Sequence, residues 1–322
     1  MLKIHILLFY VSPVPYRTYH GPCRMNAMKD IGIGRLIHTY SNIRLPAQEF
    51  LHCRETSLSQ TLPILESSPT LWHYCAMHTK ESLQSDLKRM GVDPKGTTLA
   101  HFSYNSLGYV DGGAETVIDA FIEYMSEGLM VFATHTWSTV DINQPSYSVE
   151  HTACCTGIVP ELARKRADGF RSGHPTHSVV AFGKDAKSFV AGDEHRGTPC
   201  ARDSAWGRLL DRDATILLVG VGMNRDTFIH GIEEWLDVPG RLSETPYILT
   251  SNLGEGNTVQ VLSRRHIGFP AEQFHRVEEP LKARGIITEG QIGDAKVLCH
   301  RAKAIYDALV PMLEENPRLF DK

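Results

Sequence analysis

The pattern of hydrophobic and polar positions becomes regular only from about residue 79 onward. Thr79 can cap a helix, and the apolar positions from Leu83 to Met90 follow at helical spacing. Gly91 comes next, and glycine is typical just beyond the end of a helix. The pattern therefore predicts the first helix of the chain between Thr79 and Gly91.

A strand, a helix and a second strand are predicted next, in that order. Residues 97–102 are rich in β-forming side chains, residues 114–125 carry an apolar helical stripe, and residues 129–133 form a continuous apolar run. A polar loop at 103–108 and the pair Gly112-Gly113 separate the first strand from the helix. This order is typical of a β-α-β unit, in which ligands bind where strands end. By spacing alone the glycines fit a tight turn better, because the GxGxxG pattern is absent.

The rest of the chain continues the alternation of strands and helices. Pro160 fits the first turn of one helix, Trp206 lies in a second, and a final amphipathic helix is predicted from Leu298 to about Pro311. Strands are predicted at 178–183 and at 215–221, and the second is the best candidate for a central strand. The alternation indicates a protein of the α/β class.

Residues 1–77 show no sustained helical or strand period. They are rich in Pro, Ser, His and Cys, and they contain breakers such as Ser67-Ser68-Pro69. We therefore expect a poorly patterned extension over 1–77, either disordered or not part of the native protein, and one domain over 78–322. A start at Met77 would give the cleaner domain.

Composition and charge narrow the class of protein. The chain is 42% hydrophobic and 22% charged, as in globular proteins, and its net charge of −4 argues against a nucleic-acid binder. The apolar run at 4–11 is too short to cross a membrane, and no convincing cleavage site follows it. Seven cysteines without a CxxC pair argue against a disulfide framework or a zinc site. Reduced thiols fit a cytoplasmic protein.

The stretch Arg171-Ser172-Gly173-His174-Pro175-Thr176-His177-Ser178 concentrates groups capable of chemistry. Its two histidines fit a metal pair, structural side chains or a catalytic base. Pro175 disfavours the regular helix that would place both on one face, and no third ligand is evident, so we expect no metal. Histidine has an ordinary pKa of about 6.5, which suits proton transfer near neutral pH.

This stretch is one of several motifs that together resemble the aminoglycoside N3-acetyltransferase family. The motifs are His101-Phe102-Ser103, Leu107-Gly108, Gly112-Gly113-Ala114, the stretch 171–178, Asp203-Ser204 and Thr227-Phe228-Ile229-His230-Gly231-Ile232-Glu233. Each is weak alone, but their ordered combination is specific. The resemblance covers residues 79–318 and is strongest to the branch with a His-Gly-x-Glu-Glu-Trp sequence, whose members are called acetyltransferase-like without an assigned substrate.

The resemblance implies a single α/β domain with a central sheet flanked by helices, unlike the widespread GNAT acetyltransferase fold. It implies an acyltransferase that moves acetyl from acetyl-CoA to the 3-amino group of an aminoglycoside or a related amine, and so antibiotic resistance. Carried over, the cofactor contacts are Ser103, Gly108, Gly112, Gly113 and Ser178, because backbone N–H groups at a glycine turn favour phosphate. The expected partners are CoA and a small-molecule amine. We expect no nucleic-acid or membrane partner, and a homodimer is compatible with the resemblance.

Acetylation of an amine requires a base, because an ammonium group cannot attack a thioester. His177 matches the family's Pro-x-His-Ser position, and the resemblance assigns it as the general base. Glu233 then either orients His177 or, with Glu234, binds ammonium groups of the substrate, and both roles stay open. Trp137 is a candidate for lining a sugar pocket, although packed aromatic residues are commoner. We expect His230 to be structural.

The sequence also departs from the family pattern. Phe102 and residues 104–105 differ beside the expected cofactor loop, and only Glu233 and Glu234 match acidic residues that would hold a polycationic drug. The alternative hypothesis is therefore a catalytically altered CoA-binding or acyltransferase-like protein with a non-aminoglycoside substrate. A third hypothesis is an amidase or thioesterase in which His177 activates water.

Overall fold

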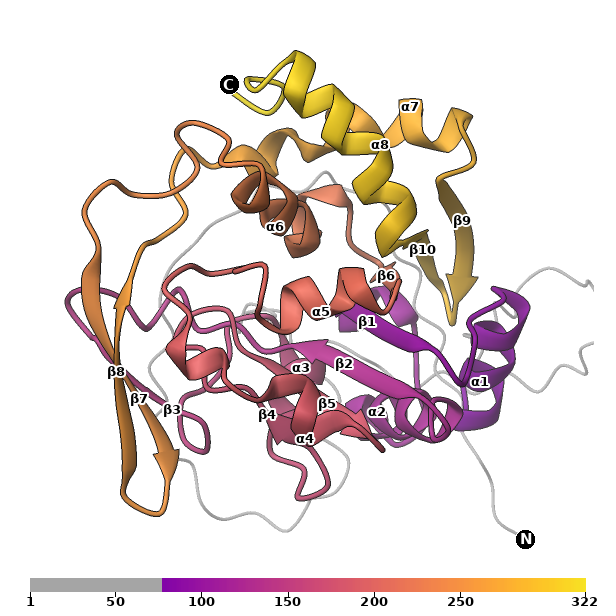
Figure 1. Cartoon of the computed structure of the whole chain (residues 1–322). Coiled ribbons are helices and arrows are strands. Elements are labelled where there is room, and N and C mark those ends of the chain that lie inside the picture. Colours follow the sequence, from indigo (N-terminus) through magenta and orange to yellow (C-terminus); the bar gives the residue numbers. More distant parts are fainter. Residues whose placement is uncertain (1–76) are drawn as a thin grey trace, which may run out of the picture. The chain divides into compact units, whose positions relative to one another are not determined.

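A mixed seven-stranded sheet runs through the described part of the protein, residues 77–322 of a computed structural model (Figure 1). The extension predicted for residues 1–77 lies outside this range except for Met77. In spatial order the strands are β4 (Phe170–Arg171), β5 (Val179–Gly183), β2 (Leu129–Ala133), β1 (Thr97–Phe102), β6 (Thr215–Val219), β10 (Ala295–Arg301) and β9 (Ile287–Ile292). The predicted α/β class is confirmed.

The middle of the sheet is parallel, as the predicted β-α-β unit requires. Strand β1 pairs in parallel with β2 on one side, beginning at Thr97↔Leu129, and with β6 on the other, beginning at Thr98↔Thr215. All three strands are buried along their whole length, as expected for continuous apolar runs covered on both faces. The outer pairings are antiparallel. The carboxyl ends of β2, β1 and β6 therefore share one edge of the sheet.

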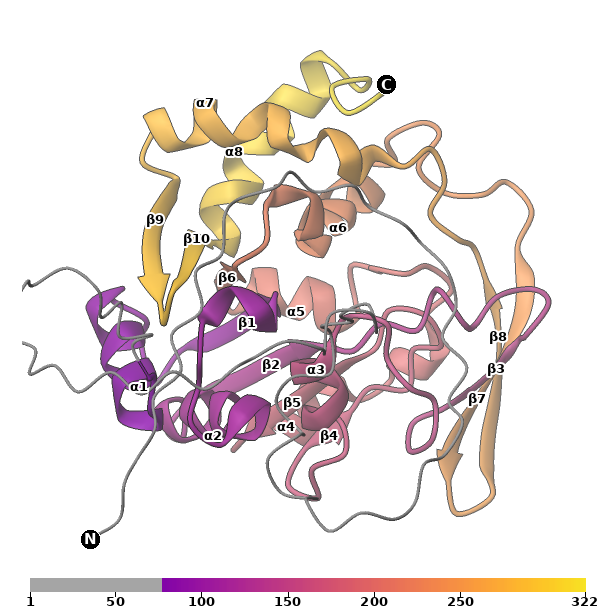
Figure 2. The same ribbon diagram turned by 180° about the vertical axis from the view of Figure 1, so that it is seen from behind.

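Helices cover both faces of this sheet (Figures 1 and 2). One apolar layer joins the sheet to α1 (Lys80–Arg89), α2 (Gly113–Tyr124) and α3 (Ile158–Ala163). The other joins it to α4 (Ala186–Val190), α5 (Ala205–Asp211), α6 (Thr227–Trp235), α7 (Glu278–Ala283) and α8 (Ala302–Glu315). Neighbouring strand residues alternate between the layers: Leu99 packs in the layer with α4 to α8, and Ala100 packs in the layer with α1 to α3. Burial on both faces holds the parallel strands in place.

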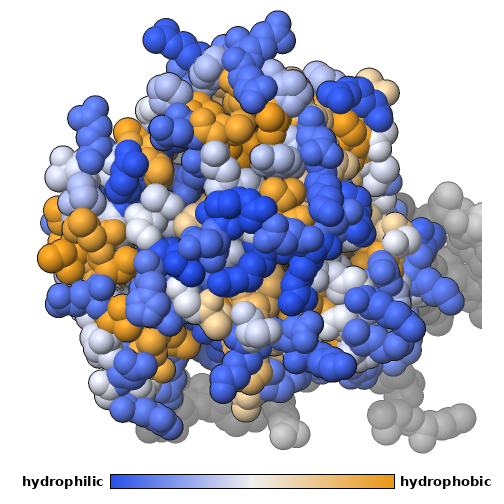
Figure 3. All heavy atoms as spheres, in the orientation of Figure 1, coloured by the Kyte–Doolittle hydropathy of each residue, from blue (hydrophilic) through white to orange (hydrophobic). Residues whose placement is uncertain are grey.

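Short 3₁₀ helices and a second sheet complete the described residues. The 3₁₀ helices are η1 (Tyr104–Leu107), η2 (Asp193–His195), η3 (Met223–Arg225) and η4 (Pro270–Val277). The second sheet has the order β3 (Ser146–Ser148), β7 (Tyr247–Gly254) and β8 (Asn257–Ser263). Figure 3 shows apolar side chains on the side formed by β7 and β8, where the cross-strand pair Ile248 and Leu262 is exposed.

The predicted final helix has different bounds from those expected. Leu298 belongs to strand β10, where it pairs with Leu218 of β6, and helix α8 begins only at Ala302. The helix then continues past Pro311 to Glu315. A buried strand position and a helical stripe both place an apolar residue inward, so spacing alone merged the two elements. Within residues 77–322 no helix is both long and apolar enough to cross a membrane.

Candidate active site

Histidine side chains from separate segments meet near the carboxyl ends of the parallel strands. His135 follows β2, and His177 precedes β5. His230 lies on α6, and His266 follows β8. The ring centroids are 4.8 Å apart for His135 and His177, 5.1 Å for His177 and His266, and 4.4 Å for His266 and His230. We call these four residues the histidine cluster.

The histidine cluster is largely shielded from water. Burial, reinforced by neighbouring imidazoles, holds the pKa of His135 and of His177 well below the usual range. Burial and the adjacent His266 also lower the pKa of His230. A buried imidazole with a lowered pKa is neutral near pH 7, so its free nitrogen can accept a proton.

His230 is the member of the cluster with a carboxylate firmly held behind it. Its Nδ1 lies 3.3 Å from Oε2 of Glu233, one turn further along α6. Nε of Arg241 donates to Oε1 of the same carboxylate, and Glu233 is 0% exposed. A carboxylate at Nδ1 orients an imidazole and stabilises its protonated form, while Nε2 is left for a reacting group. The sequence reasoning took His230 as structural and missed this pairing.

Glu233 does not hydrogen-bond to His177, although one of its two expected roles was to orient that residue. Its carboxylate is shared by His230 and Arg241, whereas Nδ1 of His177 lies 3.0 Å from the hydroxyl of Thr176. Thr176 is a neutral partner and cannot balance the charge of an imidazolium. The geometry of a base with its orienting carboxylate is therefore found at His230.

A second imidazole–carboxylate pair lies directly beside the first. Nε2 of His266 is 2.5 Å from Oε1 of Glu234, and the same oxygen accepts the backbone N–H of Cys200 at 2.8 Å. Oε2 of Glu234 is buried and has no hydrogen-bond partner among residues 77–322. Two consecutive carboxylates of α6, Glu233 and Glu234, thus each hydrogen-bond one of two stacked imidazoles.

Cys200, Glu234 and His266 also have the donor atoms of a metal site within 4.8 Å of one another. Burial raises the pKa of the Cys200 thiol well above its usual value. The imidazole and the carboxylate are already joined by a hydrogen bond. The three side chains therefore fit a hydrogen-bonded group better than a metal site.

His174 shapes the turn that holds His177. Its Nδ1 accepts the backbone N–H groups of Thr176 and His177, at 3.2 and 3.0 Å. Because two backbone donors fix Nδ1 as an acceptor, Nε2 carries the proton and donates to the carbonyl of Thr198 at 3.0 Å. Burial lowers the pKa of His174 to about 4. Both of its nitrogens are engaged, which leaves neither for a metal.

Two further candidates differ in their access to solvent. Trp137, just beyond β2, is 50% exposed and free to contact a ligand. Ser178 is fully buried, and its hydroxyl donates to the carbonyl of Thr134 at 2.7 Å. Ser178 is thus engaged inside the protein, beside the histidine cluster.

The loop after β1 is tightly organised around small residues. The hydroxyls of Ser103 and Ser106 are 2.8 Å apart. Gly108 has a φ of +77°, and a Cβ added there would lie 2.0 Å from Oδ2 of Asp294. The N–H of Gly113 donates to the carbonyl of Val110, so the expectation of a free N–H for phosphate is wrong at this residue. Gly112, with a φ of +74°, is the N-cap residue of helix α2.

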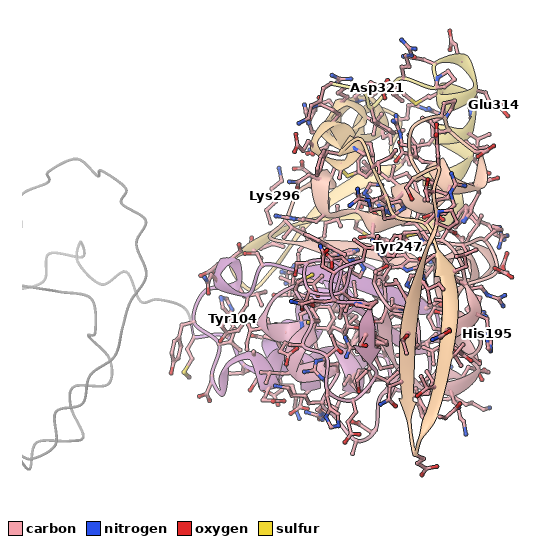
Figure 4. All side chains as sticks on the ribbon, turned by 90° about the vertical axis from the view of Figure 1, so that its left-hand side faces the viewer. Tyr104, His195, Tyr247, Lys296, Glu314 and Asp321 are labelled. Atoms are coloured by element: carbon pink, nitrogen blue, oxygen red, sulfur yellow. The ribbon has the colours of Figure 1, made fainter. Side chains whose placement is uncertain are left out.

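A cavity of about 340 Å³ opens beside this loop. Its lining comes from η1, from the segment after β6, from α7, from the β9–β10 turn and from β10. These residues are Ser106, Gly220, Val221, Gly222, Glu278, Asp294, Ala295, Lys296 and Leu298. Figure 4 shows Lys296 and Tyr104 on the same side of the domain. The cavity offers backbone groups of a glycine segment, the carboxylates of Glu278 and Asp294, and the side chain of Lys296, which pairs with Glu289 at 2.8 Å.

Comparison with known proteins gives concordant results. A family described as aminoglycoside 3-N-acetyltransferase matches residues 99–314. The aminoglycoside N(3')-acetyltransferase-like protein YokD of Bacillus subtilis (strain 168) is 27% identical, covering 67% of this chain and 85% of its own. Aminoglycoside N(3)-acetyltransferase VII of Streptomyces paromomycinus is also 27% identical, and the match covers 74% of this chain and 92% of the relative.

Solved structures share the fold. The apoenzyme of aminoglycoside acetyltransferase AAC(3)-IVa is 24% identical, with a TM-score of 0.66 over 77% of this chain and 93% of its own. A mutant of that enzyme in complex with a gentamicin is 24% identical, with a TM-score of 0.66 over 76% and 91%. AAC-IIIb, in its binary complex with CoASH, is 21% identical, with a TM-score of 0.65 over 74% of this chain and 97% of its own.

Proposed function

The chain belongs to the aminoglycoside 3-N-acetyltransferase family, and we propose that it transfers the acetyl group of acetyl-CoA to an amine of an aminoglycoside or a related compound. The observation that carries this proposal is the His230–Glu233–Arg241 arrangement near the ends of the parallel strands. Such a site supplies the base that an amine nucleophile needs. Modification of such a drug would contribute to antibiotic resistance.

In the proposed reaction the amine nitrogen attacks the thioester carbonyl. Nε2 of His230 accepts the proton that this nitrogen loses, and Glu233 stabilises the imidazolium. The proton then passes to the thiolate of CoA as the carbon–sulfur bond breaks. His177, the candidate from the sequence, stays the second choice, because its Nδ1 partner is the neutral hydroxyl of Thr176.

We place CoA along the loop after β1 and in the adjoining cavity. AAC-IIIb, which shares this fold, is known in a binary complex with CoASH, and this supports a CoA-binding site here. Ser103, Gly108 and Gly112 border the loop, and the backbone of residues 220–222 lines the cavity, where its N–H groups would face a phosphate. Gly113 contributes through its turn geometry, since its N–H is engaged.

For the acceptor we propose a cationic amine held near the histidine cluster. The unpartnered oxygen of Glu234 would attract an ammonium group, and exposed Trp137 offers an apolar face to a sugar ring. The gentamicin complex of AAC(3)-IVa makes this class of amine the first to test.

The test measures release of CoA thiol from acetyl-CoA with apramycin or gentamicin as the acceptor. His230→Gln should lower kcat by about 10²–10⁴-fold, the usual contribution of a general base. His177→Gln should lower it less than about tenfold, because its ring does not receive the proton.

The reverse ranking of the two variants would restore His177 as the base and refute His230. Stabilisation by CoA in a thermal-shift titration without turnover of any amine would support the alternative of a CoA-binding protein. Full hydrolysis of acetyl-CoA without an amine would support the thioesterase hypothesis.

A further inference from the structure

Helix α6 supplies two carboxylates in succession, and each holds a different histidine. Glu233 turns toward His230 and Arg241, while Glu234 turns toward His266 and Cys200. The two imidazoles stack with their planes 25° apart and their centroids at 4.4 Å. The proposed reaction, as written above, uses only one of these two imidazole–carboxylate pairs.

The chemistry of the proposed acceptor calls for two proton transfers. An aliphatic amine such as that of lysine has a pKa of about 10.4, so it arrives near neutral pH as an ammonium group. One proton must leave before the nitrogen can attack, and a second leaves the nitrogen after attack. The balanced reaction is R–NH₃⁺ plus acetyl-CoA to R–NH–CO–CH₃, CoA–SH and one proton released to solvent.

We propose that His266, oriented by Glu234, accepts the first proton from the incoming ammonium group, while His230 accepts the second. This inference rests on the proposed function. Nε2 of His266 is held by Glu234, so Nδ1 is the accepting atom, and it has no hydrogen-bond partner among residues 77–322. The proton from His266 goes to solvent, and the proton from His230 goes to the departing sulfur of CoA.

The surroundings of the two rings support this division of labour. The side chains of His266 and His230 are 14% and 15% exposed, so each can exchange a proton with solvent or substrate. Each imidazolium would form next to its own carboxylate, which offsets the cost of the charge. Because stacked rings at 4.4 Å repel when both are charged, the first proton must leave before His230 takes the second.

Two other groups beside His266, His177 and Cys200, are neutral, while the charged pair Glu233–Arg241 lies behind the stacked ring of His230. His177 contacts it edge to face at 5.1 Å, and burial holds the pKa of His177 well below the usual range. The thiol of Cys200 is protonated, because burial raises its pKa well above the usual value. Glu234 is the carboxylate in direct hydrogen-bond contact with His266.

The experiment measures kcat/KM for apramycin from pH 6 to pH 10 with the full chain and saturating acetyl-CoA. Gln keeps the hydrogen bond to Glu234 but accepts no proton, so His266→Gln should lower kcat/KM at pH 7 by about tenfold or more. At a pH where the acceptor amine is already neutral, the first transfer is not needed, and the variant should approach wild type. The control is His195→Gln, which alters an exposed histidine of η2 and should match wild type throughout (Figure 4).

Three results would overturn the inference. If His266→Gln lowers kcat/KM equally at every pH, His266 has a structural role. If the pH profile of kcat/KM is unchanged, His266 has no role in the reaction. If His266→Gln does not fold, as judged by circular dichroism, Glu234→Gln should show the same defect that recovers at high pH, and its absence counts against the proposal. A wild-type chain that releases no CoA thiol with any amine would refute the proposed function itself.

Discussion

Gly108 shows how little space separates the loop after β1 from the β9–β10 turn. Gly108→Ala would place a methyl group 2.0 Å from the carboxylate of Asp294 at a φ of +77°. We expect destabilisation by about 2–4 kcal/mol, from positive-φ strain and overpacking together. CoA binding should weaken as well, because the loop borders the cavity. Urea unfolding and thermal shift measure the two effects.

Gly91→Ala is the matched control, because Gly91 has a φ of +74° but nothing within 4 Å of an added Cβ. It isolates the strain of the backbone, about 1 kcal/mol. If both variants lose the same stability, the close approach to Asp294 is not significant.

Single residues also show which part of the site was predictable. The three-residue spacing of His230 and Glu233 places both on one helix face, and that signal was present in the sequence. It was missed because no helix was predicted at 227–235. Arg241 and His266 carried no such signal, since they reach the cluster from segments that only the tertiary fold brings near.

Helix α6 is the element that positions the proposed catalytic groups, and its start is fixed by Asp226. The side chain of Asp226 accepts the N–H of Phe228 at 3.3 Å and pairs with Nε2 of His300 at 2.8 Å. Asp226→Ala should cost about 2–4 kcal/mol, since it removes the helix cap and leaves His300 unpaired in the core. A displaced α6 should also lower kcat for CoA release.

Thr79→Ala provides the comparison at another helix, because Thr79 caps α1 in the same way. It should cost about 1 kcal/mol and leave kcat unchanged. Should Asp226→Ala behave like Thr79→Ala in both measurements, Asp226 would be an ordinary cap without influence on His230.

Among the elements, the sequence predicted those whose burial imposes a clear period. Strands at 97–102 and 129–133 have the expected bounds, because both lie buried in the middle of the sheet. The β7–β8 and β9–β10 hairpins were missed, since β8 and β9 expose much of their length and mix polar with apolar residues. Their pairing is decided by contacts between strands, not by local pattern.

On the scale of the whole molecule, buried histidines make stability depend on pH. Burial lowers the pKa of His101 and of His174 to about 4, and it holds the pKa of His135 and of His177 well below the usual range. An imidazole with a folded-state pKa below its unfolded value of about 6.5 binds protons preferentially in the unfolded chain. Its contribution to stability is complete above about pH 6.5 and is lost as the pH falls toward 4.

The free energy of unfolding should therefore fall steeply on acidification. Between pH 7 and pH 5, His101 and His174 together should lose roughly 4 kcal/mol of stability, with His135 and His177 adding in the same direction. Asp193 acts oppositely, because burial raises its pKa to about 7, but one carboxyl does not outweigh four imidazoles. We expect the Tm to drop by roughly 10 °C over this range, and differential scanning fluorimetry measures it. A Tm that stays level or rises from pH 7 to pH 5 would show that these histidines accept protons in the folded protein without penalty.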